Sequence, residues 1–174
     1  MSPPPPSSPS APAPLVTERL ELRPWTDEEL DAVVANTRLP HWAEDFPAEG
    51  DTVIAGFLRE RPEALGEFGH RTVSERETGL VVGSIGLFWP PLEGRLEIGY
   101  GIVASRRGLG YATEATRALA AHGLTAPGVR TVEAQVETAN PASVRVLEKA
   151  GMRLLDRDGE MVRYGLGAPA PSED

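Results

Sequence analysis

The chain has 174 residues, 40% hydrophobic and 25% charged, and its 26 acidic and 17 basic side chains give a net charge of −9. These values are typical of a globular protein that buries one core, and the acidic balance argues against nucleic acid as the main partner. With no cysteine and three scattered histidines, the sequence excludes a disulfide framework, a cysteine nucleophile and a thiolate zinc site, and we expect no metal.

The two ends of the chain differ in composition from the rest. Residues 1–14 hold seven prolines and four serines and no charge. Such a segment buries too little apolar surface to fold, so we expect a disordered tail there and a second flexible tail at residues 168–174. Residues 15–167 are expected to form a single domain. The sequence has neither a bilayer-length apolar stretch nor a signal-like start, so we expect a cytoplasmic protein without a membrane partner.

Between the tails, strand and helix signals alternate. Period-two alternation at 17–23 predicts a strand, and Thr26 with Glu29 three residues later forms a capping box that opens a helix. Asp51 opens a second amphipathic helix, which Pro62 ends. Then follow strands at 68–74, 80–88 and 95–103, a helix at 111–122, a strand at 129–137, a helix at 141–150, and strands at 152–156 and 161–166. The order β-α-α-β-β-β-α-β-α-β-β predicts a mixed α/β sheet.

A glycine-rich turn follows the fourth predicted strand and opens the helix at 111–122. It reads Arg106-Arg107-Gly108-Leu109-Gly110-Tyr111-Ala112. Glycines at such a turn let main-chain N–H groups converge on an anion, and the helix dipole favours negative charge there. The turn therefore predicts a phosphate ligand, with a plain packing turn as the alternative. It fits neither the dinucleotide fingerprint, because Thr113 stands where a third glycine is needed, nor the P-loop, which requires Gly-Lys.

Several blocks carry a resemblance to a known family. Residues 107–112 fit the pattern Arg/Gln-x-x-Gly-x-Gly/Ala, and they resemble the pyrophosphate loop of the GCN5-related N-acetyltransferases (GNAT). Five blocks resemble the branch that acetylates ribosomal-protein N-termini: Thr17-Glu18-Arg19-Leu20, Val82-Gly83-Ser84-Ile85-Gly86, Glu97-Ile98-Gly99-Tyr100, Tyr111-Ala112-Thr113-Glu114-Ala115, and Asn140-Pro141-Ala142-Ser143 with Gly151-Met152. The likeness runs from Leu15 to Leu166. It implies a mostly antiparallel central sheet flanked by helices, and direct acetyl transfer from acetyl-CoA to an amine in a ternary complex.

The resemblance also implies which residues bind acetyl-CoA. Main-chain N–H groups of the glycine-rich turn would hold the pyrophosphate. The strand at 95–103 would leave its neighbour at a bulge favoured by Gly99 and Gly101, and its end would pair with the pantetheine arm. Asn140 precedes Pro141 at a predicted helix start, where Asn is a good N-cap. The resemblance implies that Asn140 also reaches the pantetheine arm. The expected cofactor-binding residues are Ile102, Val103, Arg107, Gly108, Leu109, Gly110, Tyr111, Ala112 and Asn140.

Two residues are the catalytic candidates. By resemblance, Ser143 or a water donates a proton to the departing thiolate; many relatives carry a Tyr four residues further on, where this chain has Leu147. The amine must lose a proton, and an α-amine with a pKa of about 7.8 requires only about 1 kcal/mol for this at pH 7. Glu97, acting through a water, is the candidate base, and an exposed or salt-bridged strand residue is the alternative. His70 is a weaker candidate, and Glu114 is expected to pack or cap.

The acceptor is expected to be the N-terminal amine of a protein or peptide. A small amine, such as an amino acid, polyamine or aminoglycoside, is one alternative, and a non-catalytic acyl-CoA-binding module is an alternative of another class. Aromatic and acidic side chains at 41–46, together with Trp89, are predicted to line the acceptor pocket because they suit a cationic amine. The sequence leaves a homodimer open.

Overall fold

The computed structural model describes residues 12–167, so nearly all of the two predicted tails lies outside the described residues. The mixed α/β order is observed, with one short strand added at the start. The elements are β1 (Leu15–Val16), β2 (Leu20–Pro24), α1 (Asp27–Val34), α2 (Glu49–Glu60), the 3₁₀ turn η1 (Pro62–Leu65), β3 (His70–Glu75), β4 (Val81–Leu92), β5 (Arg95–Ile102), the 3₁₀ turn η2 (Ala104–Arg106), α3 (Tyr111–Gly123), β6 (Thr131–Glu137), α4 (Pro141–Lys149), β7 (Arg153–Asp158) and β8 (Met161–Gly167).

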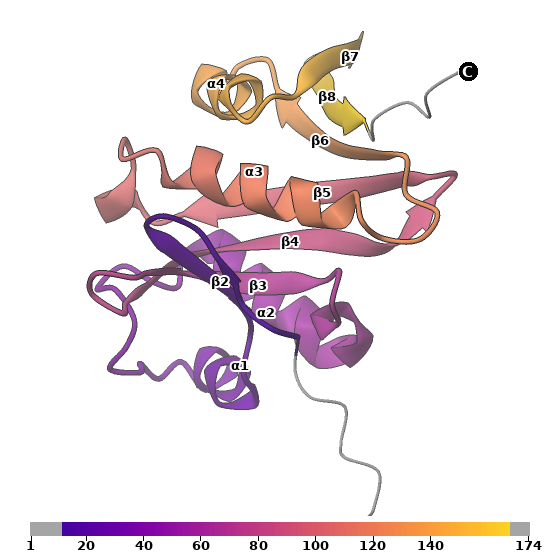
Figure 1. The fold of residues 1–174 in the computed structure, drawn as a ribbon. Coiled ribbons are helices and arrows are strands. Elements are labelled where there is room, and N and C mark those ends of the chain that lie inside the picture. The colour runs from indigo at the N-terminus through magenta and orange to yellow at the C-terminus, as the bar shows by residue number, and fades with distance from the viewer. Residues whose placement is uncertain (1–11, 168–174) are drawn as a thin grey trace, which may run out of the picture.

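The strands form one sheet in the order β1-β2-β3-β4-β5-β6-β8-β7 (Figure 1), and among the strand pairs described only β5 and β6 run parallel. The predicted mostly antiparallel sheet is therefore confirmed. Helices cover both faces. Leu87 of β4 packs against α3 near Gly123, whereas Ser84 of the same strand bonds to Asp51 of α2. Because side chains alternate along a strand, α3 and α2 lie on opposite faces.

The first predicted strand, 17–23, begins three residues too early, because β2 starts at Leu20. Residues 17–19 form a turn between β1 and β2, because the Thr17 hydroxyl accepts from the Leu20 N–H at 3.1 Å and the Thr17 N–H donates to the Leu20 carbonyl at 2.9 Å. The period-two pattern at 17–23 belongs partly to this short hairpin. The turn directs Arg19 toward the loop before α3, where it bonds to the Leu109 carbonyl.

The helix starts follow their capping residues. The capping box of Thr26 and Glu29 is present at the start of α1, as predicted. Helix α2 begins at Glu49, two residues before the predicted start, and Asp51 in its first turn accepts from the Ala48 N–H at 2.9 Å.

Within residues 12–167 no helix is long and apolar enough to span a membrane.

Strands β5 and β6 diverge halfway along β5. They pair at Arg95, Leu96 and Glu97 of β5, and the pairing ends there. The predicted bulge is absent, because β5 stays in register with β4 from Glu97 to Ile102. The fork arises where β6 departs, and it leaves one edge of β5 open beside the N-terminal turn of α4.

Candidate active site

The loop between β5 and α3 carries two glycines and leads into the N-terminus of α3. Gly108 and Gly110 have φ of 78° and 85°, in the left-handed region that favours glycine. Gly110 is the N-cap of α3, and no side chain caps this helix end. The first N–H groups of α3 therefore have no partner within the helix. This arrangement is the one expected of an anion-binding turn, and the phosphate ligand itself stays a prediction.

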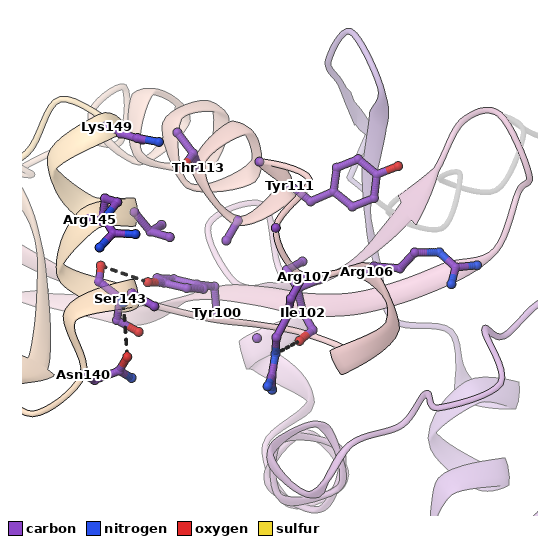
Figure 2. A pocket seen from close by; sticks show the side chains of 16 residues that line it. Tyr100, Ile102, Arg106, Arg107, Tyr111, Thr113, Asn140, Ser143, Arg145 and Lys149 are labelled. Atoms are coloured by element: carbon purple, nitrogen blue, oxygen red, sulfur yellow. Dashed lines mark hydrogen bonds between the residues drawn. The ribbon is translucent and has the colours of Figure 1, made fainter.

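A cavity of about 520 Å³, called here the loop cavity, lies between this loop, the open edge of β5 and α4 (Figure 2). Predicted residues from three separate segments meet there. Those that line it are Ile102, Arg107, Gly108, Gly110, Tyr111, Ala112, Asn140 and Ser143.

Arg145 and Lys149 also line the loop cavity, and sequence reasoning missed them. They are exposed and lie one turn apart on α4, across the cavity from the loop (Figure 2). The signal that could have found them is the i, i+4 spacing of two cations on the helix that begins at Asn140. Arg106, by contrast, bonds to Glu75 at 3.1 Å, so its charge is already paired.

The open edge of β5 presents main-chain groups to the loop cavity. The Val103 N–H donates to the Val82 carbonyl of β4 at 2.9 Å. Main-chain groups alternate in direction along a strand, so those of Tyr100 and Ile102 point away from β4. The Ile102 carbonyl accepts from Arg107 Nε at 3.3 Å (Figure 2).

Two predicted cofactor residues do not line the loop cavity. Val103 is 1% exposed, and its carbonyl accepts from the Arg106 N–H at 3.0 Å, so both of its main-chain groups are already bonded. The Leu109 side chain is exposed, and its carbonyl accepts from Arg19 Nη1 at 2.7 Å. These residues shape the loop and the strand end from outside the cavity.

Asn140 and Ser143 lie side by side at the start of α4. Asn140 Oδ1 caps the helix by accepting from the Ser143 N–H at 3.2 Å, and both residues line the cavity. The Tyr100 hydroxyl donates to the Ser143 carbonyl at 3.4 Å, which brings a phenol to the same point (Figure 2). Burial raises the pKa of Tyr100, so the phenol keeps its proton. Leu147 is fully buried in the core.

A second cavity of about 470 Å³, called here the α2 cavity, lies on the opposite face of the sheet. Glycines stand in two rows of its floor; the rings of His70 and Phe88 lie over Gly86 and Gly99, and the space over Gly101 is open. Gly86 pairs with both His70 and Gly99 in one row, and Ser84 pairs with Gly101 in the next. The residues that line both cavities are Tyr100, Gly101, Ile102 and Arg107.

Buried polar groups line the α2 cavity. Asp51 is 4% exposed and accepts from the Ser84 hydroxyl and the Ala48 N–H. Burial raises the pKa of Asp51, against the effect of these two donors. His70 is 3% exposed, and its Nε2 has no hydrogen-bond partner among the described residues. Burial lowers the pKa of His70 to about 4, so the imidazole is neutral at pH 7.

Glu97 lies at the fork of β5 and β6 and lines neither cavity. It is the last β5 residue that pairs with β6, and its exposed side chain is on the same face as Gly99. It is one pleat, about 7 Å along the strand, from that glycine. Phe88, its partner on β4, lines both the α2 cavity and the groove that holds Glu97.

The predicted acceptor segment lines neither the loop cavity nor the α2 cavity. Within 41–46, Trp42 and Phe46 are buried and their rings pack edge to face at 5.3 Å. His41 Nε2 lies 3.0 Å from Glu29. These aromatic side chains form the core beneath α1, and Trp89 stacks on Phe68 outside both cavities.

Glu114 lines neither the loop cavity nor the α2 cavity. It accepts from the Thr17 hydroxyl at 2.6 Å, so its contacts are those of a packing residue. Within residues 12–167, no group of three or more His, Asp or Glu side chains is arranged to hold a metal ion.

Comparisons with known proteins agree with this fold. Residues 19–153 match the acetyltransferase (GNAT) domain. The chain is 32% identical over 163 residues to the uncharacterized N-acetyltransferase p20 of Bacillus licheniformis, covering 82% of this chain and 91% of that protein. An acetyltransferase structure from Agrobacterium tumefaciens matches with a TM-score of 0.65 at 26% identity, covering 90% and 95% of the two chains. A candidate ribosomal-protein-serine acetyltransferase from Vibrio cholerae matches with a TM-score of 0.66 at 21% identity, covering 91% and 99%.

Proposed function

Because the chain belongs to the acetyltransferase (GNAT) family, we propose that it is an acetyl-CoA-dependent N-acetyltransferase acting on the N-terminal amine of a protein or peptide. The observation that carries this proposal is the meeting of two cavities across β5, where Gly101 and Ile102 line both. The loop cavity suits a donor that carries phosphates. The α2 cavity suits an amine, and the strand between them is where donor and acceptor would meet.

The residues of the loop cavity fit coenzyme A. The uncapped N-terminus of α3 offers N–H groups to a diphosphate. Arg145 and Lys149 add positive charge on the facing helix. Ile102 offers main-chain groups at the open edge of β5, which an amide-bearing arm can pair with. When bound, acetyl-CoA supplies an acetyl group activated as a thioester.

The chain's own residues handle the two protons of the reaction. Glu97, one pleat from Gly99 at the edge of the α2 cavity, accepts through a water the proton that the amine loses as the C–N bond forms. The Ser143 hydroxyl donates a proton to the sulfur as the C–S bond breaks. Tyr100, bonded to the Ser143 carbonyl, is a second donor at this position.

The choice of an N-terminal amine is supported by sequence blocks. The segments 17–20 and 140–143 resemble the branch that acetylates ribosomal-protein N-termini, and the Vibrio cholerae structure of the same fold is a candidate member of that activity class. An α-amine also needs little help to lose its proton, in keeping with a base that acts through a water.

Thiol release from acetyl-CoA with a panel of peptides and small amines tests the proposal, together with mass spectrometry of a cell extract incubated with labelled acetyl-CoA. We expect peptides to raise thiol release and N-terminal acetylation to appear in the extract. Glu97→Gln should bind coenzyme A normally and turn over at least tenfold more slowly, while Glu137→Gln, an exposed control on β6, should be unaffected. Coenzyme A binding without thiol release for any acceptor would instead indicate a binding module.

A further inference from the structure

We infer that Asp51 binds the ammonium group of the acceptor, and that the α2 cavity selects a primary amine with a single positive charge and a small or apolar flank. This inference rests on the proposed function, because it concerns the acceptor of that reaction. It adds a binding residue and a substrate class to the site.

The first argument is the unpaired charge of Asp51. The residue is 4% exposed, yet no Lys, Arg or His side chain forms an ion pair with it in the described part of the chain. A buried carboxylate is normally compensated by a cation. Both partners of Asp51, the Ser84 hydroxyl and the Ala48 N–H, are neutral. A carboxylate has about four acceptor positions, so about two stay available to a cation in the cavity that it lines.

Capping of α2 does not by itself account for the burial of Asp51. Glu49 in the same first turn is exposed and already places negative charge at this helix end. Asp51 instead bonds across to Ser84 of β4, whose partner on β5 is Gly101, the floor position with open space above it. The Asp51 carboxylate therefore belongs to the lining of the α2 cavity as well as to the first turn of α2.

The other lining groups restrict the acceptor to one charge. Of the remaining polar side chains in the α2 cavity, Arg107 is cationic, and His70, Ser84 and Tyr100 are neutral. Ile54 and Phe88 are apolar. A second ammonium group would find no carboxylate among the residues lining this cavity and would meet the Arg107 guanidinium. A polyamine is therefore a poor fit.

His70 supplies a second, neutral recognition group. Its Nε2 is buried, lacks a partner among the described residues and belongs to a ring that lines the cavity. The ring is held edge-on to Phe57 and Phe88 at 5.7 and 4.9 Å, and a Cβ at Gly86 would lie 2.0 Å from its Nδ1. A neutral imidazole pairs with an amide or hydroxyl. An α-amine followed by a peptide group offers both the cation and this partner.

The test uses Asp51→Asn, which removes the charge and keeps an oxygen for the Ala48 N–H. The matched control is Glu49→Gln, which removes the same charge from the same helix turn outside the cavity. The probes are a Ser-Ala-Ala peptide amide and spermidine. For Asp51→Asn we expect the KM of the peptide to rise roughly 10- to 100-fold above that of the wild type. The KM of acetyl-CoA should stay within about twofold of the wild-type value. Glu49→Gln should leave both values unchanged.

A binding measurement provides a readout independent of turnover. Calorimetry of the peptide amide against the protein saturated with coenzyme A should show binding for the wild type and its loss in Asp51→Asn. Spermidine should have a kcat/KM at least tenfold below that of the peptide. Should Asp51→Asn fail to fold, Val53→Lys adds a cation at the exposed rim of the cavity and should raise the peptide KM, whereas Val34→Lys on α1 should not.

The outcomes separate the inference from the proposed function. No thiol release by the wild type with any acceptor removes the proposed function. Peptide acetylation with an unchanged peptide KM in Asp51→Asn, or in Val53→Lys where that variant is used, overturns the assignment of Asp51 and leaves the function standing. Equal efficiency with spermidine and peptide overturns the restriction to a single charge.

Discussion

Arg19 clamps the loop before α3 by bonding to Glu114, 95 residues further along the chain, at 2.8 Å between Nε and Oε1. Its Nη1 donates to the Leu109 carbonyl at 2.7 Å, and its guanidinium lies 4.9 Å from the Tyr111 ring centre. Thr17 bonds to the other oxygen of the same carboxylate. The turn at 17–19 and the glycine-rich loop before α3 therefore form one structural unit.

Arg19→Met should weaken coenzyme A binding, although Arg19 does not line the loop cavity. The variant keeps the stem of the side chain and loses the bonds to Glu114 and to the Leu109 carbonyl, so the loop samples more conformations. We expect a rise in Kd of roughly threefold to tenfold and a loss of about 1 kcal/mol in unfolding free energy. Calorimetry and thermal melting measure both quantities. Arg153→Met, on an exposed strand, is the control, and equal Kd values for the two variants would contradict the clamp.

Gly110→Glu should abolish coenzyme A binding. Gly110 lines the loop cavity and has a φ of 85°, which L side chains rarely adopt, and a Cβ there would lie 3.2 Å from Arg19 Nη2, so a Glu would distort the turn and bring a negative charge to it. Gly151→Ala is the matched control, because Gly151 has a φ of 94° with open space around it. Both substitutions should lower the unfolding free energy by about 1–2 kcal/mol. A fluorescence titration with coenzyme A separates them, and retained binding in Gly110→Glu would refute anion binding at this turn.

Removal of both cations on α4 should weaken coenzyme A binding and reduce its salt dependence. The double variant Arg145→Gln with Lys149→Gln keeps polar side chains at both positions of α4. It removes two positive charges from the wall of the loop cavity. We expect the Kd to rise roughly tenfold at low salt, with a smaller difference at high salt. Titrations at two ionic strengths measure this. A Kd equal to that of the wild type at low salt would show that these side chains do not reach the phosphates.

Local signals were enough to predict parts of the fold and of the site. The capping box of Thr26 and the glycines of the loop at 107–112 act within a few residues, so the sequence identifies them directly. Helix α4 likewise lies between Pro141 and Gly151, close to its predicted bounds. For the same reason the glycine turn that opens α3 was predictable at the residue level, whereas anion binding there stays a prediction.

The α2 cavity could not be predicted in this way. It exists because His70, Gly86 and Gly99 fall in one row across three strands, and a slip of one residue would turn those positions to the other face. Asp51 then reaches the floor from a helix whose position depends on tertiary packing. The aromatic side chains at 41–46 show the converse, since their composition suggested a pocket and their packing made them core.

His70 should destabilise the protein in mild acid. Its pKa falls from 6.5 to about 4 on folding because the ring is buried. The unfolded chain therefore binds a proton between these pH values that the folded chain does not, and stability is lost as the pH falls through this window. His70→Gln should flatten the stability curve between pH 6.5 and 4 relative to the wild type. Denaturant titrations across this range measure the effect, and parallel curves would contradict it.

Glu29 should control stability at lower pH. Its carboxylate is 1% exposed and bonds to both Nη atoms of Arg23 at 2.8 and 2.9 Å and to His41 at 3.0 Å. Burial alone would raise its pKa, but these partners outweigh it and lower the pKa from 4.5 to about 2. A carboxyl with a depressed pKa stabilises the fold fully above pH 4.5 and loses that contribution as the pH falls toward 2.

Glu29→Gln should therefore lower the unfolding free energy at pH 7 by on the order of 3 kcal/mol and flatten the acid limb between pH 4.5 and 2. Glu28→Gln removes the same charge from the exposed neighbouring position of α1 and should change the free energy by less than about 0.5 kcal/mol. Urea unfolding at a series of pH values measures both variants. Acid limbs of equal slope in the wild type and Glu29→Gln would show that the Arg23 pair does not hold this carboxylate charged.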